Sequence, residues 1–152
     1  MEKNMKDNIY NLKQLLKNDE AILNEWYQMI GARSVEEEAQ YQADRATARK
    51  HFEMLQEEIK KHINDVMDRA YFDYQGEIYD KDYNMIEYIP NLVYLVTDDC
   101  DMEDDDIDDL NDFIQNDLYD RAWRWTEKRD ELPEVMKTYF QLVRSELLDY
   151  CL

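Results

Sequence analysis

The only two histidines, His51 and His62, are the first residues to test for metal or acid–base chemistry. They are eleven residues apart, which on one helix places them on the same face but about 16 Å apart along the axis, too far to share an ion. The residues three positions before them are Ala48 and Ile59, so the Glu-x-x-His motif of di-iron bundles is absent. Glu58 can reach His62 across one helical turn, where the spacing predicts only a surface hydrogen bond. We expect no metal site and no cofactor.

The carboxylate run at residues 98–109 has the composition of a calcium-binding loop. If the loop starts at Asp101, the next ligand position is also acidic, at Glu103. The glycine that such a loop needs at its sixth place is replaced by Asp106, and its closing glutamate by Asp112. The sequence therefore argues against an EF-hand and allows only weak, nonspecific binding of divalent ions.

Groups for covalent or phosphate chemistry are scarce. Ser34 and Ser145 are the only serines, and neither lies in a Gly-x-Ser-x-Gly turn. Gly31 and Gly76 are the only glycines, so neither a P-loop nor a dinucleotide-binding fingerprint can form. The sequence predicts that the protein is not an enzyme.

Cys100 and Cys151 would allow one disulfide, but free thiols in a reducing cytoplasm are the expectation. Residues 1–19 are charged throughout and lack the apolar region of a secretory signal. The longest apolar run, residues 92–96, is far shorter than the roughly 18 residues that suggest a membrane span. We expect a cytoplasmic protein.

The charge is strongly negative and unevenly distributed. The 152 residues contain 18 Lys and Arg against 37 Asp and Glu, a net charge of −19. Residues 1–76 carry a net charge of −4, whereas residues 77–152 carry −15. Such a chain is unsuited to binding nucleic acid directly or to docking on an anionic membrane, because both require cations. The expected partner is instead strongly basic.

The pattern of apolar residues predicts an all-α or mostly α fold, a helical bundle with more than 60% helix. Two amphipathic stretches come first, residues 9–16 and 22–30, with Asp19 as a candidate cap between them and Gly31 as a stop. Ser34 and Glu37 form a capping box ahead of a long helix at about 34–70. A helix should follow the acidic run and bury Ile107, Leu110, Phe113, Ile114, Leu118, Ala122 and Trp125. A last helix should begin near Pro133, with an apolar stripe at Val135, Met136, Tyr139, Leu142, Val143 and Leu147.

Tyrosines are concentrated at residues 71–97, and residues 91–97 have strand character. Because a lone strand has no partner, we expect helical turns and loop in this segment. The alternative is a small hairpin that uses residues 77–79 or 86–89.

The length suits one compact domain, or two small ones that share a long helix. We predict a single domain, 1–152, with a near-neutral helical half (1–76) and a strongly acidic half (77–152).

Arg121, Trp123, Arg124 and Trp125 combine residue types that often anchor interfaces. The first interpretation is that Trp125 packs in the core and that the guanidinium groups pair with the nearby carboxylates of Asp117 and Asp120. The alternative is a patch for self-association.

The acidic run is the main candidate site. Nine of its twelve residues are acidic, whereas the macrodipole of one helix accounts for only two or three carboxylates. The surplus repels itself and weakens the fold, which favours a binding role over simple solvation. The predicted partner-binding residues are Asp98, Asp99, Asp101, Glu103, Asp104, Asp105, Asp106, Asp108 and Asp109, flanked by Asp112.

In this composition the chain resembles the small acidic DNA-mimic inhibitors of phages and plasmids, which include antirestriction and some anti-CRISPR proteins. The likeness is carried by residues of the segment 77–120, namely Glu77, Asp80, Asp82, Glu87, Asp98 to Asp109, Asp112, Asp117 and Asp120. It implies a viral protein in the host cytoplasm. It also implies an inhibitor that presents carboxylates where a restriction or CRISPR nuclease expects phosphates.

Two other functions stay open from the sequence. One is a non-enzymatic helical adaptor or structural protein that binds a basic partner, or forms a homodimer through the long helix. The other is a domain that binds divalent ions or is enzymatic.

Overall fold

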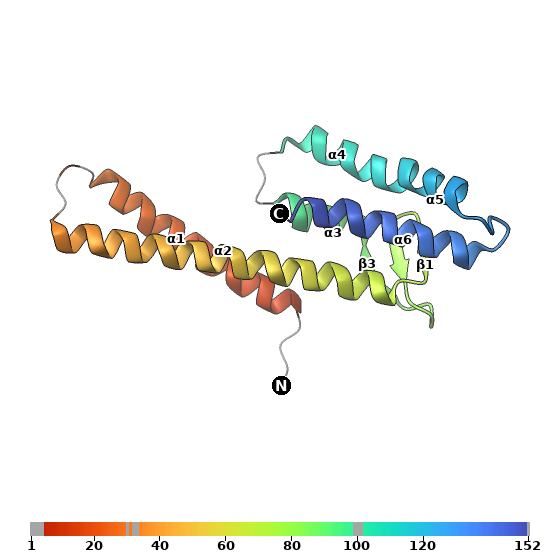
Figure 1. The fold of residues 1–152 in the computed structure, drawn as a ribbon, viewed down its shortest axis with the longest axis horizontal. Coiled ribbons are helices and arrows are strands. Elements are labelled where there is room, and N and C mark those ends of the chain that lie inside the picture. The colour runs from red at the N-terminus through yellow and green to blue at the C-terminus, as the bar shows by residue number, and fades with distance from the viewer. Residues whose placement is uncertain (1–4, 30, 32–33, 99–101, 152) are drawn as a thin grey trace. The chain divides into compact units, whose positions relative to one another are not determined.

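The computed structural model describes residues 5–29, 31, 34–98 and 102–151. The structure is 76% helical with a small three-stranded sheet, which confirms the predicted mostly α class. The helices are α1 (Met5–Gln28), α2 (Val35–Arg69), α3 (Ile89–Thr97), α4 (Asp104–Asp112), the π-helical η1 (Phe113–Leu118), α5 (Tyr119–Trp125) and α6 (Leu132–Asp149). The strands are β1 (Phe72–Tyr74), β2 (Glu77–Tyr79) and β3 (Met85–Tyr88). Figure 1 labels the six α-helices and strands β1 and β3.

The chain divides into two compact units, Met1–Ile59 and Lys60–Leu152. The boundary falls within α2, so the predicted long helix exists and supplies residues to both units. The first unit carries a net charge of −4 and the second −15. The excess acid therefore belongs to the second unit. The prediction that 1–152 form one domain stays a prediction.

The first unit is a helical hairpin in which α1 runs antiparallel to α2. The backbone N–H of Glu37 donates to Ser34 Oγ at 3.2 Å, as the predicted capping box requires at the start of α2. Trp26 Nε1 donates to Asp44 Oδ2 at 2.7 Å, and Asp19 Oδ2 lies 2.7 Å from His51 Nδ1. Asp19 was predicted to cap a second helix and is instead inside a continuous α1, because this contact with α2 holds its side chain.

The second unit contains an antiparallel sheet in the order β1-β2-β3. Gln75 and Gly76 connect β1 to β2 with φ values of 51° and 86°, the conformation of a two-residue hairpin turn. Asp80 Oδ1 accepts the backbone N–H groups of Asp82 and Asn84 and so shapes the connection from β2 to β3. The expectation of helical turns and loop was wrong for residues 72–88, where a small hairpin forms, and is confirmed for residues 91–97. The hairpin differs from the alternative because residues 77–79 pair with β1 and β3 and not with residues 91–97.

Residues 91–97 are helical despite their strand-like composition. Pro90 occupies the first turn of α3, where its missing N–H costs no hydrogen bond. Leu92, Val93 and Val96 are fully or almost fully buried. A short helix that is buried on most sides has a continuous apolar sequence. Its composition is then the same as that of a buried strand, so composition alone does not distinguish the two.

The second unit has its core between helices. In Figure 1, α4 and α5 form one rod beside α6, and α6 also contacts β1. The predicted stripe of α6 is buried at Val135, Met136, Tyr139, Val143 and Leu147. The Cys151 thiol is buried and donates to the Leu147 carbonyl oxygen at 3.7 Å, and Cys100 lies outside the described residues.

The rod buries Leu110, Ile114, Leu118, Ala122 and Thr126, a strict spacing of four residues. In a continuous α-helix each such step overshoots a full turn by about 40°, so the stripe would rotate away from the core. The π-helical η1 holds more residues per turn because its hydrogen bonds close at i→i+5, and this compensates the rotation. Trp125 is therefore 62% exposed, and its predicted place in the buried stripe was wrong.

Candidate acidic surface

The acidic run is organised by α4. Asp104, Asp105 and Asp106 form its first turn, where carboxylates interact favourably with the helix macrodipole. Ile107 and Leu110 turn inward, and Leu110 is only 6% exposed. Six of the ten predicted residues belong to this helix and are exposed: Asp104, Asp105, Asp106, Asp108, Asp109 and Asp112.

Of the four remaining predicted residues, two flank the helix and two lie outside the described residues. Glu103 is the exposed N-cap residue of α4, and Asp98 is the exposed C-cap residue of α3. Asp99 and Asp101 lie outside the described residues. The structure thus brings six carboxylates together on one helix with a seventh at its cap.

Helical geometry sets the spacing of these carboxylates. Asp104, Asp108 and Asp112 follow one another at i, i+4, and Asp105 and Asp109 form a parallel row. Neighbours in such a row have Cβ atoms about 5–6 Å apart. The nine residues of α4 span about 13.5 Å, so the helix carries about one charge per 2 Å, close to the one per roughly 1.7 Å of duplex DNA.

No cation neutralises this surface from within the neighbouring sequence. Residues 82–120 contain no Lys, Arg or His. Each like-charge i, i+4 pair destabilises a helix by about 0.2–0.5 kcal/mol. The dipole compensates only the first turn, so Asp108, Asp109 and Asp112 add repulsion without that benefit.

Two acidic residues that carried the DNA-mimic resemblance are not on an acidic face. Glu87 is 3% exposed and forms a buried hydrogen bond with His62, because its strand packs against a helix. Asp80 is engaged in the turn after β2. Asp112, Asp117 and Asp120 are exposed and extend the acidic surface along the rod.

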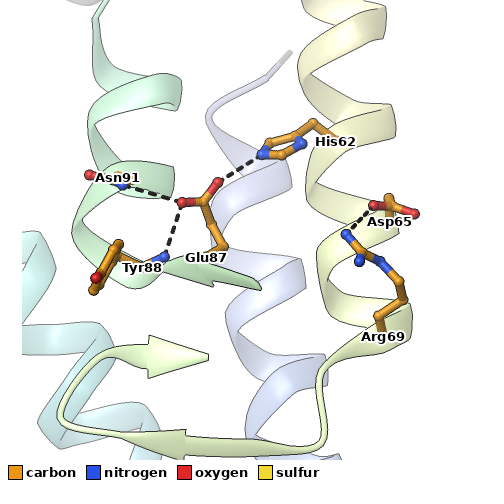
Figure 2. A network of polar contacts seen from close by, with 6 residues as sticks. All are labelled: His62, Asp65, Arg69, Glu87, Tyr88 and Asn91. Atoms are coloured by element: carbon orange, nitrogen blue, oxygen red, sulfur yellow. Dashed lines mark hydrogen bonds and ion pairs between the residues drawn. The ribbon is translucent and has the colours of Figure 1, made fainter. Parts of the chain in front are cut away.

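A buried polar network surrounds Glu87, and Figure 2 shows its residues. Glu87 Oε2 lies 3.0 Å from His62 Nε2, and its other oxygen accepts from Tyr88 N–H and Asn91 Nδ2. The sequence predicted a hydrogen bond between His62 and Glu58 at the surface. The predicted surface position was wrong, since His62 is only 7% exposed. Glu87 was missed as the partner because no local pattern links residues 25 positions apart. The close pairing of a buried carboxylate and imidazole satisfies both groups and leaves neither open to a ligand.

The segment with arginine and tryptophan is also arranged differently from its first interpretation. The Arg121 guanidinium lies over the Phe113 ring, 5.2 Å from the centroid, and Trp123 packs edge-on against Tyr119. Among the described residues, neither Asp117 nor Asp120 forms an ion pair with an arginine. Trp125 does not pack in the core, which leaves the predicted self-association patch as a prediction.

Comparisons with family models, curated proteins and solved structures find no match. Within residues 5–29, 31, 34–98 and 102–151, no three His, Cys, Asp or Glu side chains are grouped as metal ligands. No helix in those ranges combines the length and apolar character needed to cross a bilayer.

Proposed function

We propose that this protein inhibits a nucleic-acid-binding enzyme by occupying its basic channel with the carboxylates of α4. The enzyme is of the restriction or CRISPR nuclease type. The observation that supports this function is the linear charge density of α4, which is close to that of duplex DNA and is carried by exposed carboxylates. A helix with one buried side and six exposed carboxylates is a rigid way to present such a charge.

The proposed binding is a summed electrostatic effect. A single exposed ion pair contributes about 0.2–1 kcal/mol, so no one carboxylate dominates. The negative field of the second unit accelerates encounter with a basic channel and weakens as salt rises. A DNA duplex and this protein would compete for the same cations.

The test replaces four carboxylates together, Asp104, Asp105, Asp106 and Asp109 to Asn. A control of equal charge change replaces four exposed acidic residues of the first unit, Glu20, Glu25, Glu36 and Glu53, with Gln. Partners are captured from bacterial lysate with the unaltered protein and identified by mass spectrometry. Their affinity for all three proteins is then measured across salt, with and without a DNA duplex as competitor.

The proposal expects that DNA displaces the protein, that the affinity falls steeply with salt, and that only the α4 variant loses binding. Binding that tolerates DNA, or equal losses in the α4 variant and the control, would contradict it. Unchanged binding and salt dependence in the α4 variant would also contradict it and direct attention to Trp123, Trp125 or residues 71–94.

A second candidate function is a helical adaptor that self-associates through its hairpin. Leu15 and Ile22 of α1 and Met29 directly after it are spaced seven residues apart and are 42%, 42% and 43% exposed. An apolar stripe at this spacing is typical of helices that pack against a further helix. Light scattering of the protein and of Ile22→Glu tests it: a dimer that the substitution converts to a monomer supports the adaptor, and a monomer throughout contradicts it.

A further inference from the structure

The structure contains an open groove of about 470 Å³ where the β1–β2 turn meets η1 and α5. Asp73 is the acidic residue in its lining, and Phe72, Tyr74 and Tyr119 supply aromatic rings. Gln115 and Asn116 of η1 add two side-chain amides. All of these residues belong to the second unit.

The π-helical turn and the glycine at the hairpin turn shape this groove together. A Cβ atom on Gly76 would lie 3.0 Å from Gln115 Oε1, so the turn and η1 approach as closely as a glycine allows. Turns of the π type often occur at functional sites. Here the turn brings consecutive amide side chains to the same groove.

Two polar atoms are unpaired here, one on Asp73 in the groove lining and one on Tyr139, which is not among the lining residues. Asp73 Oδ1 and the Tyr139 hydroxyl are both buried and have no hydrogen-bond partner. A buried polar atom without a partner costs about 1–3 kcal/mol, and more when it is charged. Since the terminal torsion of an aspartate is broad, the Asp73 carboxyl group can turn either oxygen toward the groove.

We infer that this groove binds a cationic group, the guanidinium or ammonium of an arginine or lysine side chain. A carboxylate with one oxygen that accepts no hydrogen bond, beside aromatic rings, is the arrangement that such cations prefer. The net charge of the second unit, −15, favours a cation over any anion at this place. The inference adds to the proposed function an anchoring contact for a basic partner, but its test does not use that partner.

The site predicts a dependence on pH. Burial raises the pKa of Asp73 to about 6; the Glu77 carboxylate also raises it, and the backbone N–H of Gly76 partly offsets the rise. The Tyr139 side chain also interacts with Asp73, and burial raises the pKa of its hydroxyl above the usual range, so it carries no charge where Asp73 titrates. Only ionised Asp73 attracts a cation, so affinity should rise about tenfold between pH 5 and pH 7.5.

The test is an NMR titration of the full chain with N-acetyl-arginine methylamide, N-acetyl-lysine methylamide and the neutral isostere N-acetyl-citrulline methylamide. The cations should shift the Gly76 amide and the Gln115 and Asn116 side-chain amides, whereas citrulline should not. Asp73→Asn should weaken the binding about tenfold, the loss of one charged hydrogen bond. Tyr74→Ala, at a side chain that is 55% exposed, should weaken it without disturbing the core.

Asp149→Asn is the matched control, an exposed residue at the end of α6 away from the groove, and should bind as the unaltered protein does. Equal affinity for arginine and citrulline, shifts confined to α4, or no loss in Asp73→Asn would overturn the inference. Failure here leaves the α4 variant's test of the proposed function unaffected. The α4 variant should still bind the arginine probe in the groove, even though it no longer binds the basic partner.

Discussion

His62 and Glu87 form a buried hydrogen bond, with 3.0 Å between His62 Nε2 and Glu87 Oε2, that ties α2 to the end of β3. The side chains are 9% and 3% exposed. Because an ionised carboxylate only accepts hydrogen bonds, His62 donates, and Tyr88 N–H and Asn91 Nδ2 donate to the other oxygen. Glu87 therefore satisfies three donors where the sheet ends and α3 begins.

Glu87→Ala should lower the free energy of unfolding by at least about 1–3 kcal/mol, the cost of one buried group left without a partner, because it leaves a buried imidazole and two further donors without an acceptor. Glu87→Gln keeps the shape and one carbonyl oxygen, so it should cost less. Urea unfolding at pH 7 measures both. As a control, Glu146→Ala on α6 should change the stability by less than about 0.5 kcal/mol. A loss of similar size in the two alanine variants would mean that the pair is not stabilising.

The carboxylates of α4 should differ in their effect on stability according to their place in the helix. Asp108→Asn combined with Asp112→Asn relieves repulsion beyond the first turn and should raise the unfolding free energy by about 0.5 kcal/mol. Asp104→Asn removes a favourable interaction with the dipole and should lower it by about 0.3–1 kcal/mol. In the fourfold Asn variant these effects oppose each other, so its melting temperature should hold or rise. Thermal unfolding at low salt checks the signs, and high salt should shrink both differences.

Asp73 should make the protein less stable as pH rises. Its pKa is raised to about 6, so its contribution is fully present below pH 3.8 and is lost as pH rises through 6. Asp73→Asn removes this loss and should be more stable than the unaltered protein at pH 7.5 by about 1–2 kcal/mol, after allowance for partial exposure. At pH 4 the two should differ little. Urea unfolding at both pH values isolates the effect, and a constant difference across pH would contradict it.

The β1–β2 turn offers a stabilising substitution. Gln75 has φ of 51°, a left-handed conformation that asparagine tolerates better, and the resulting Asn-Gly pair is favoured in such turns. Gln75→Asn should raise the unfolding free energy by about 0.5–1 kcal/mol. Gly76→Ala should lower it by about 1 kcal/mol, because Gly76 has φ of 86°. If both variants matched the unaltered protein, the turn would not have this conformation in solution.

The local pattern was sufficient where a helix is long and its signals agree. The capping box at Ser34 and the absence of glycine and proline up to Ala70 predicted α2 almost to the residue. Pro133 marked the start of α6, and its apolar spacing identified most of the buried side. The charge asymmetry needed only the sequence, because charge is carried by residue type.

Tertiary contacts decided the rest. The strand-like residues 91–97 became a helix because they pack on most sides, and a short sheet formed where turns at Gln75 and Asp80 bring weak strands together. Trp125 is exposed because the π-helical turn changes which side chains of the rod face the core. A prediction that assumes a regular helical period does not include such a turn. His62 is hydrogen-bonded to Glu87, and Asp73 interacts electrostatically with Tyr139, although both pairs are far apart in the sequence. Side chains so distant share no periodicity, so only the folded packing determines their partners and their burial.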